Sequence, residues 1–202
     1  MVFVFDLDDT LCDSDAYSEF YIRNFFLKNN LPYKQIAKRA RYAEAKFDWS
    51  EKTALEWYKT YGDEMMLEFP CIDSARKVIN HLHDSNHKII IATARANDWH
   101  TEPEKITLEW LKRNDIKYDN VFIGRIDKEK ICEEVNADFF IDDDLKITKR
   151  VAEYFNGNKN KHAFLSTTEY NKTFAAPDGV ERILDFNDFY KKVEKYLSPK
   201  QK

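Results

Sequence analysis

The chain has 202 residues, of which 43% are hydrophobic and 15% aromatic, with a formal net charge of −4 and a pI near 5.8. This composition is typical of one globular domain, with or without an inserted subdomain, and it excludes an intrinsically disordered chain. The acidic balance disfavours broad binding to extended nucleic acid or to a membrane surface.

Three cysteines, Cys12, Cys71 and Cys132, are widely spaced and form no CxxC motif. We interpret them as reduced thiols, which predicts a cytoplasmic protein. The apolar start of the chain is too short for a secretory signal peptide, and Asp6 interrupts it. No apolar run approaches the roughly 20 residues that span a bilayer, so we expect no membrane segment.

Short apolar runs alternate with helical patterns along most of the chain. The runs predict strands at 2–7, 88–94, 120–123, 138–141 and 162–165. Because these runs are continuously apolar, we expect strands that are covered on both faces. Helical patterns lie between them, at about 74–85, 103–114, 128–135, 147–155 and 187–197. This alternation predicts an α/β fold: a Rossmann-like three-layer core with a mostly parallel sheet.

The stretch 15–70 breaks this alternation and has no strand pattern. Its aromatic and apolar residues recur at helical spacing in three groups, at 17–25, 33–47 and 54–61. Ser50 precedes the third group and suits a helix N-cap. We therefore predict a small helical cap subdomain over 15–70, inserted into a core formed by 1–14 and 71–202.

Polar side chains gather where the predicted strands end. Asp6 and Asp8 end the first strand, Thr93 and Arg95 the second, and Asp142, Asp143 and Asp144 the fourth, while Lys128 and Lys130 begin the helix before the fourth. The carboxyl ends of parallel strands meet at one edge of a sheet, where ligands bind. We expect these groups to face one another across a crevice at that edge.

A crowd of carboxylates repels itself unless a cation lies among its members. Oxygen ligands that are few in number, with water completing an octahedron, predict Mg²⁺ as the cofactor. Such a site also suits a phosphate, since metal and lysine would offset its charge beside an attacking carboxylate. Asp6 is then a candidate nucleophile that forms an aspartyl-phosphate, Asp8 a candidate acid and base, and Thr93 a ligand of a phosphoryl oxygen.

The motifs FDLDDT, IIIATAR, the later DK and FFIDDD resemble, in order, the four motifs of the haloacid dehalogenase superfamily of phosphotransferases. The helical stretch after the first motif resembles the cap that lies over the active site in that superfamily. A narrower resemblance, carried by TLEWLKRNDIKYDNVFIGRIDK, FFIDDD and HAFLSTTEYNK, is to the 5′(3′)-deoxyribonucleotidase branch (5′ nucleotidase, deoxy, cytosolic type C). It covers most of the chain outside 15–70.

The resemblance implies a role for each matched residue. Asp6 corresponds to the nucleophile and Asp8 to the acid and base. Thr93 and Lys128 complete the catalytic set, and with Ala94 they correspond to the phosphate-binding groups. The ligands implied for Mg²⁺ are Asp6, the backbone carbonyl of Asp8, and Asp143.

Two points stay open in this comparison. Lys130 rivals Lys128 for the lysine role, because the stretch from Lys128 to the acidic pair is longer than in the animal enzymes. The residues of 15–70 do not match the family's base-binding pocket, so the nucleotide preference is undetermined. Supporting groups would be Arg95, Lys130 and Asp142.

The favoured function is a Mg²⁺-dependent phosphomonoester hydrolase, a nucleotidase that acts on (deoxy)nucleoside monophosphates. One alternative is a phosphatase that acts on another small phosphorylated metabolite or on a nucleic-acid end. A second alternative is a non-catalytic module that binds a nucleotide or a partner. The complete set of polar residues at the strand ends disfavours the non-catalytic module, because a site without activity would tolerate losses there. The sequence leaves the oligomeric state open.

Overall fold

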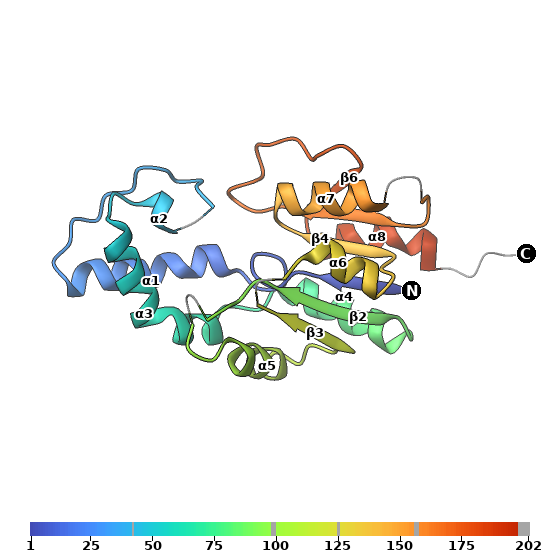
Figure 1. Ribbon diagram of the computed structural model, residues 1–202, viewed down its shortest axis with the longest axis horizontal. Helices are drawn as coiled ribbons and strands as arrows, with labels where there is room; N and C mark the ends of the chain where they lie inside the picture. The colour runs from blue at the N-terminus through green and yellow to red at the C-terminus, as the bar shows by residue number, and fades with distance from the viewer. Residues whose placement is uncertain (42, 98–99, 125, 156–157, 198–202) are drawn as a thin grey trace, which may run out of the picture.

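The computed structural model describes residues 1–41, 43–97, 100–124, 126–155 and 158–197, and every structural statement below concerns these residues. One sheet has the strand order β3-β2-β1-β4-β5-β6, and each neighbouring pair runs parallel (Figure 1). The strands are β1 (Val2–Phe5), β2 (Lys88–Thr93), β3 (Asn120–Ile123), β4 (Phe139–Asp142), β5 (His162–Ser166) and β6 (Val180–Ile183). The α/β fold with a mostly parallel sheet is confirmed.

Helices cover both faces of this sheet and give it three layers. They are α4 (Asp73–Asp84), α5 (Pro103–Arg113), α6 (Lys128–Glu134), α7 (Leu145–Phe155) and α8 (Phe186–Leu197). Side chains alternate across a strand, so Phe3 and Phe5 pack with α4, α5 and α8, whereas Val4 packs with α6 and α7. The five strand ranges and five helix ranges predicted for the core match these elements, apart from shifts of one or two residues at their ends.

The sixth strand, β6, was not predicted. Its sequence, VERI, has two polar residues between two apolar ones, and Glu181 is exposed while Val180 and Ile183 are buried. As the last strand in the sheet order it lies at an edge. An edge strand does not need the continuously apolar run that identifies the inner strands.

Residues 14–68 contribute no strand to the sheet and form α1 (Ser14–Lys28), α2 (Ala43–Lys46) and α3 (Glu51–Glu68), which lie beyond one end of the sheet (Figure 1). Aromatic rings fill the space between them. The Phe26 ring centroid lies 5.3 Å from that of Trp49 and 5.7 Å from that of Phe47. Ser50 caps α3 as expected, since its hydroxyl accepts a hydrogen bond from the Thr53 N–H.

The helix expected over 33–47 is wrong except for the four residues of α2. Tyr33 and Ile36 are exposed, so a helix there would have no apolar face to bury. Instead, Gln35 pairs with Phe47 in an antiparallel bridge, and Phe47 enters the aromatic cluster. The division into a core and a 15–70 subdomain stays a prediction.

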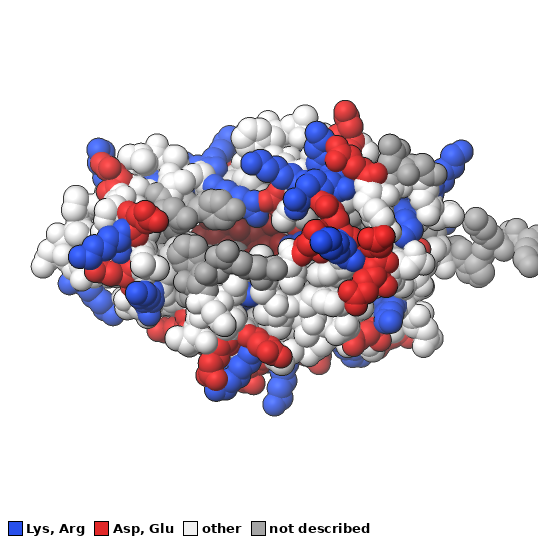
Figure 2. Space-filling view, viewed as in Figure 1, with Lys and Arg blue, Asp and Glu red and all other residues white. Residues whose placement is uncertain are grey.

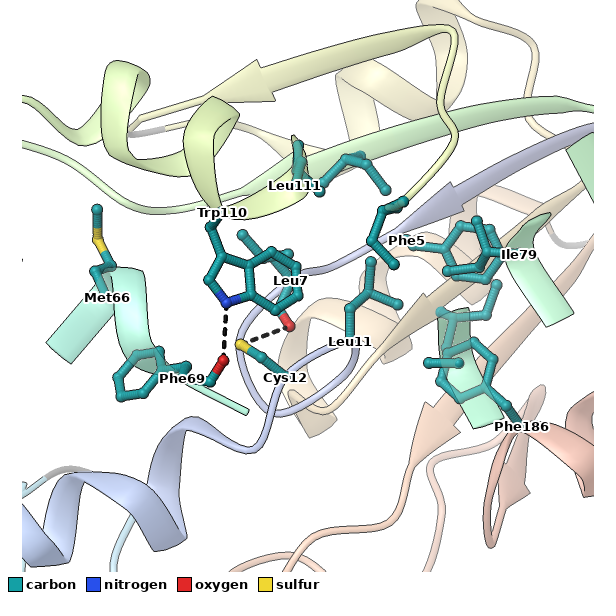
Figure 3. Packing of buried hydrophobic residues seen from close by; sticks show 14 of the residues in the cluster. Phe5, Leu7, Leu11, Cys12, Met66, Phe69, Ile79, Trp110, Leu111 and Phe186 are labelled. Carbon is teal, nitrogen blue, oxygen red and sulfur yellow. Dashed lines mark hydrogen bonds between the residues drawn. The ribbon is translucent and has the colours of Figure 1, made fainter. Parts of the chain in front are cut away.

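The two connections between residues 14–68 and the core run side by side. Cys12 and Cys71 form an antiparallel bridge, in which Asp13 N donates to Pro70 O (3.0 Å) and Ile72 N donates to Leu11 O (2.9 Å). Next to it, Trp110 Nε1 of α5 donates to Phe69 O at 2.8 Å (Figure 3). The cysteines are all free thiols. No helix in the described part of the chain is long and apolar enough to cross a membrane.

Candidate active site

The strand order reverses between β1 and β4, which is the topological switch point where open α/β sheets bind ligands. Asp6 follows β1, and its N–H donates to Ile141 O of β4 at 2.9 Å. Asp142 is the last residue of β4 and Asp143 follows it. The parallel pairing of β1 and β4 therefore brings the first and last acidic motifs of the sequence together.

Lys128 lies between two of these carboxylates. Its Nζ is 2.6 Å from Asp6 Oδ1 and 2.6 Å from Asp142 Oδ2, and only 4% of the lysine is exposed. Lys128 is the first residue of α6, where the Asp127 side chain caps the helix and fixes where it begins. Lys130, in contrast, projects a side chain that is 81% exposed and lies 3.9 Å from Asp127. Of the two rival lysines, only Lys128 lies with the strand-end carboxylates.

Asp6, Asp142 and Asp143 each offer an oxygen within 4.8 Å of the others. Asp142 has no free oxygen, because Oδ2 contacts Lys128 and Oδ1 accepts from Asp144 N at 2.8 Å. Asp143 lines the cavity above the strand ends, together with Asp6. Asp143 is therefore better placed than Asp142 to meet a ligand from the cavity.

Asp8 forms a bidentate ion pair with Arg95. Arg95 Nη2 is 2.7 Å from Asp8 Oδ1 and Arg95 Nε is 3.0 Å from Asp8 Oδ2. The arginine is 4% exposed, and its guanidinium carbon lies 5.9 Å from the centre of the Phe69 ring. Arg95 thus directly positions Asp8 within the ligand-free site.

The remaining predicted residues lie around this pair. Thr93 is fully buried, and its hydroxyl is 3.5 Å from Asp8 Oδ2. It also accepts from Arg95 N at 3.4 Å, so in this structure it supports the Asp8–Arg95 pair. Ala94 is exposed and lines the cavity. Arg125, three residues before Lys128 in the matched run GRIDK, lies outside the described residues.

Burial and charge move the pKa values of the two motif-one aspartates in opposite directions. Burial raises the pKa of Asp6 to about 7, although Lys128 counteracts part of this rise. Burial also acts on Asp8, but the Arg95 guanidinium outweighs it and holds the pKa of Asp8 below its ordinary value. Burial, and then the neighbouring Asp142, raise the pKa of Asp143 well above the ordinary value. The environment of the site therefore favours the protonated forms of Asp6 and Asp143 and the ionised form of Asp8.

A cavity of about 570 Å³ opens above these groups. Figure 2 shows acidic side chains at the bottom of a recess on this face. Apolar side chains such as Ile22, Tyr58 and Met65 and charged ones such as Lys46 and Arg41 complete its walls, all from the helical residues 14–68. This volume suits a small molecule rather than a polymer.

These residues fit a hard divalent cation. All the candidate ligand atoms are oxygens, and three carboxylates converge, of which Lys128 contacts Asp6 and Asp142. The raised pKa values of Asp6 and Asp143 reflect burial and uncompensated negative charge, which a bound cation would offset.

Sequence reasoning missed the ion pair of Asp144 and the contacts on the backbone carbonyl of Asp143. Arg41 forms an ion pair with Asp144, which also caps α7 through the N–H groups of Lys146 and Ile147. Tyr170 and Asn171 both donate to the backbone carbonyl of Asp143. The adjacent Tyr170 and Asn171 in the matched run HAFLSTTEYNK were the only sequence signal for the contacts on Asp143. Nothing in the sequence indicated the ion pair between Arg41 and Asp144.

The sequence matches the family described as "5' nucleotidase, deoxy (Pyrimidine), cytosolic type C protein" over residues 1–191. No curated protein matches it. Among solved structures, the chain is similar to a haloacid dehalogenase-like hydrolase from Streptococcus pneumoniae at 14% identity and a TM-score of 0.65, covering 98% of each chain.

Two similar structures contain magnesium. One is a D,D-heptose bisphosphate phosphatase from B. bronchiseptica with magnesium and phosphate, at 12% identity and a TM-score of 0.57, covering 96% of this chain and 98% of that chain. The other is the putative hydrolase YfnB from Bacillus subtilis, at 14% identity and a TM-score of 0.61, with the same coverage. At these identities the likeness shows a shared fold.

The family match spans nearly the whole chain. The chain therefore belongs to the deoxy, cytosolic type C family of 5′ nucleotidases, within the haloacid dehalogenase superfamily, and is a hydrolase of phosphomonoesters.

Proposed function

We propose that this hydrolase is a Mg²⁺-dependent nucleotidase that cleaves (deoxy)nucleoside monophosphates through an aspartyl-phosphate on Asp6. The observation that carries the proposal is the position of Lys128 Nζ, 2.6 Å from both Asp6 and Asp142, beside Asp143 at the cavity floor. A buried ammonium beside a carboxylate favours its ionised form and attracts a phosphate.

Asp6 would attack phosphorus and displace the alcohol of the substrate. The bond from an Asp6 oxygen to phosphorus forms as the ester bond to the leaving oxygen breaks. Lys128 would favour ionised Asp6, together with the bound cation, and would offset charge on the phosphoryl oxygens. The backbone at Ala94 borders the cavity and could hold another of these oxygens, as Thr93 would once it leaves Asp8.

Asp8 would give a proton to the leaving oxygen and later accept one from the water that attacks the intermediate. Its ion pair with Arg95 favours the ionised carboxylate. The acid role therefore requires that Asp8 loosen its contact with Arg95 when substrate binds and take up a proton from solvent before it gives one to the leaving oxygen. An incoming phosphate supplies a competing anion for the guanidinium.

Asp6, the backbone carbonyl of Asp8, and Asp143 would hold Mg²⁺. When bound, the ion would supply positive charge that favours ionised Asp6 and stabilises charge on the transferring phosphoryl group. The magnesium in two structures of the same fold supports this choice.

The family description supports a nucleotide as the substrate and a cytoplasmic location, since it names a cytosolic 5′ nucleotidase. The mixed apolar and charged wall from residues 14–68 supports a role for 15–70 as a cap subdomain that encloses the leaving group. An aromatic side chain such as Tyr58 and cations such as Lys46 suit a flat base and a sugar.

The decisive experiment pairs a substrate panel with Asp6→Asn. Nucleoside monophosphates and other phosphomonoesters are assayed with Mg²⁺ and with EDTA. We expect nucleotides to be the best substrates, EDTA to stop turnover, and Asp6→Asn to lower kcat by about 10⁴-fold or more with the fold retained. The matched control is Asp84→Asn, at an exposed carboxylate paired with Lys117. Undiminished hydrolysis by Asp6→Asn would refute the aspartyl-phosphate.

A further inference from the structure

The backbone carbonyl of Asp143 receives two side-chain hydrogen bonds from the loop after β5. The Tyr170 hydroxyl donates to it at 2.5 Å and Asn171 Nδ2 donates to it at 2.9 Å. Tyr170 is 7% exposed and Asn171 is fully buried. Two buried donors on one carbonyl, beside the site's aspartates, are more than the closing of a surface loop requires.

The orientation of the Asn171 amide is determined by its partners. Nδ2 also donates to Ser166 O at 2.7 Å, while Oδ1 accepts from Thr168 N at 3.1 Å and from Arg182 Nη1 at 2.9 Å. Exchanging the amide oxygen and nitrogen would place an acceptor against the two carbonyls of Ser166 and Asp143. Asn171 can therefore only donate to Asp143.

Arg182 extends this network to the edge of the sheet. It lies on β6, and its Nη2 donates to Asn171 O at 3.2 Å and to Phe174 O at 2.8 Å. The loop that carries Asn171 is thus clamped to a strand of the sheet. A rigid strand thereby supports the two donors that contact Asp143.

These contacts act on Asp143 in two ways. Fixing the peptide unit after Asp143 fixes the direction in which its side chain leaves the backbone. Two donors also offset the partial negative charge of the carbonyl of Asp143, a residue whose carboxylate already lies within 4.8 Å of those of Asp6 and Asp142.

We propose that Tyr170 and Asn171 are positioning residues that set the Mg²⁺ affinity of Asp143 without touching metal or substrate. The inference rests on the proposed function, in which Asp143 binds Mg²⁺. Partners that orient a metal ligand commonly change metal affinity by about 10- to 100-fold when they are removed.

Two variants separate this role from a merely structural one. Tyr170→Phe removes one hydroxyl and keeps the ring. Asn171→Asp keeps the shape but replaces the donor by a carboxylate oxygen. The matched control is Tyr190→Phe, whose hydroxyl bonds His81 Nε2 at 3.0 Å between α4 and α8.

Binding of Mg²⁺ alone is measured by calorimetry on each folded protein, and the Mg²⁺ dependence of kcat is measured separately. We expect the Mg²⁺ Kd to rise about 10-fold in Tyr170→Phe and more in Asn171→Asp, and to stay unchanged in Tyr190→Phe. Saturating Mg²⁺ should restore kcat in Tyr170→Phe, and its KM for the nucleotide should match the wild type.

A structural role alone would lower the melting temperature in EDTA and leave the Mg²⁺ Kd of the folded protein unchanged. That result in Tyr170→Phe, with a wild type that binds Mg²⁺ and hydrolyses nucleotides, overturns the inference and leaves the proposed function intact. A wild type that neither binds Mg²⁺ nor hydrolyses phosphomonoesters overturns both. If Asn171→Asp does not fold, the Mg²⁺ Kd of Tyr170→Phe alone tests the inference.

Discussion

The strand-end site and the helical residues 14–68 are built on different principles. The site consists of buried charges held by paired hydrogen bonds at the end of a parallel sheet, whereas the helices are held together by aromatic rings. Charged contacts have strict geometry, while apolar packing tolerates exchange of residue type at similar volume. Under the proposed function, the reaction takes place in the site, as the rigid part, and residues 14–68 select the substrate, as the adaptable part.

Removing Lys128 tests the rigid part most severely. Lys128→Met leaves Asp6 and Asp142 without their shared cation, so we expect kcat to fall about 10³-fold and the free energy of unfolding to fall by about 3 kcal/mol. Steady-state kinetics and urea unfolding measure the two effects.

Lys130→Met is the matched control, because its exposed side chain should contribute no more than about 0.5 kcal/mol. If the two lysine variants behaved alike, the charged site would not depend on the contacts described here.

A cavity among the aromatic rings tests the adaptable part. Phe26 is 2% exposed, and Phe26→Ala should lower the stability of residues 14–68 by about 3–5 kcal/mol. Hydrogen exchange should show the loss in α1 and α3, while the Mg²⁺ affinity of the sheet-end site stays unchanged.

Phe20→Ala provides the control, since Phe20 lies on the same helix and is 55% exposed. A large fall in Mg²⁺ affinity in Phe26→Ala would show that the two regions are one energetic unit, and the comparison would fail.

The smallest expected effect is a pH dependence specific to Asp6. Its pKa is raised from 3.8 to about 7, so the folded state retains a proton that the unfolded chain has released. The contribution of Asp6 to stability is therefore present below pH 4 and is lost as pH rises towards about 7. Saturating Mg²⁺ should oppose this loss, because the ion binds the ionised carboxylate.

The measurement is the difference in unfolding free energy between wild type and Asp6→Asn, in EDTA, from pH 4 to pH 8. The difference is needed because burial lowers the pKa of three histidines, which changes stability in the opposite sense near pH 6.5. These are His87, His100 and His162. A difference that does not change with pH would contradict the raised pKa of Asp6.

The sequence predicted the core well because its signals are local. Short apolar runs identified five of the six described strands, and the polar residues that end or follow β1, β2 and β4 identified the end of the sheet that holds the site. Parallel pairing then dictated that Asp6 and Asp142 meet. Contacts between segments far apart in sequence left no such local signal, so the pairing of Arg41 with Asp144 could not be foreseen.

Two errors have different physical origins. β6 was missed because the polar Glu181 and Arg182 interrupt its apolar run, whereas 33–47 was predicted as helix from the rule of apolar spacing. That rule assumes that an apolar residue is buried, yet Ile36 is 60% exposed. The sequence also could not show which of Lys128 and Lys130 lies in the site. The two lysines are only two residues apart, and they differ in burial, which the sequence does not reveal.

The bridge between Cys12 and Cys71 has a consequence for how such a protein can change over time. The chain leaves the sheet and returns to it at adjacent points, so everything between them is a loop closed at its base. Segments of different length could be exchanged there without moving a strand, because neither end would have to shift. A lineage could thus acquire a new substrate by replacing one continuous stretch of the gene while the hydrolytic centre stays in place.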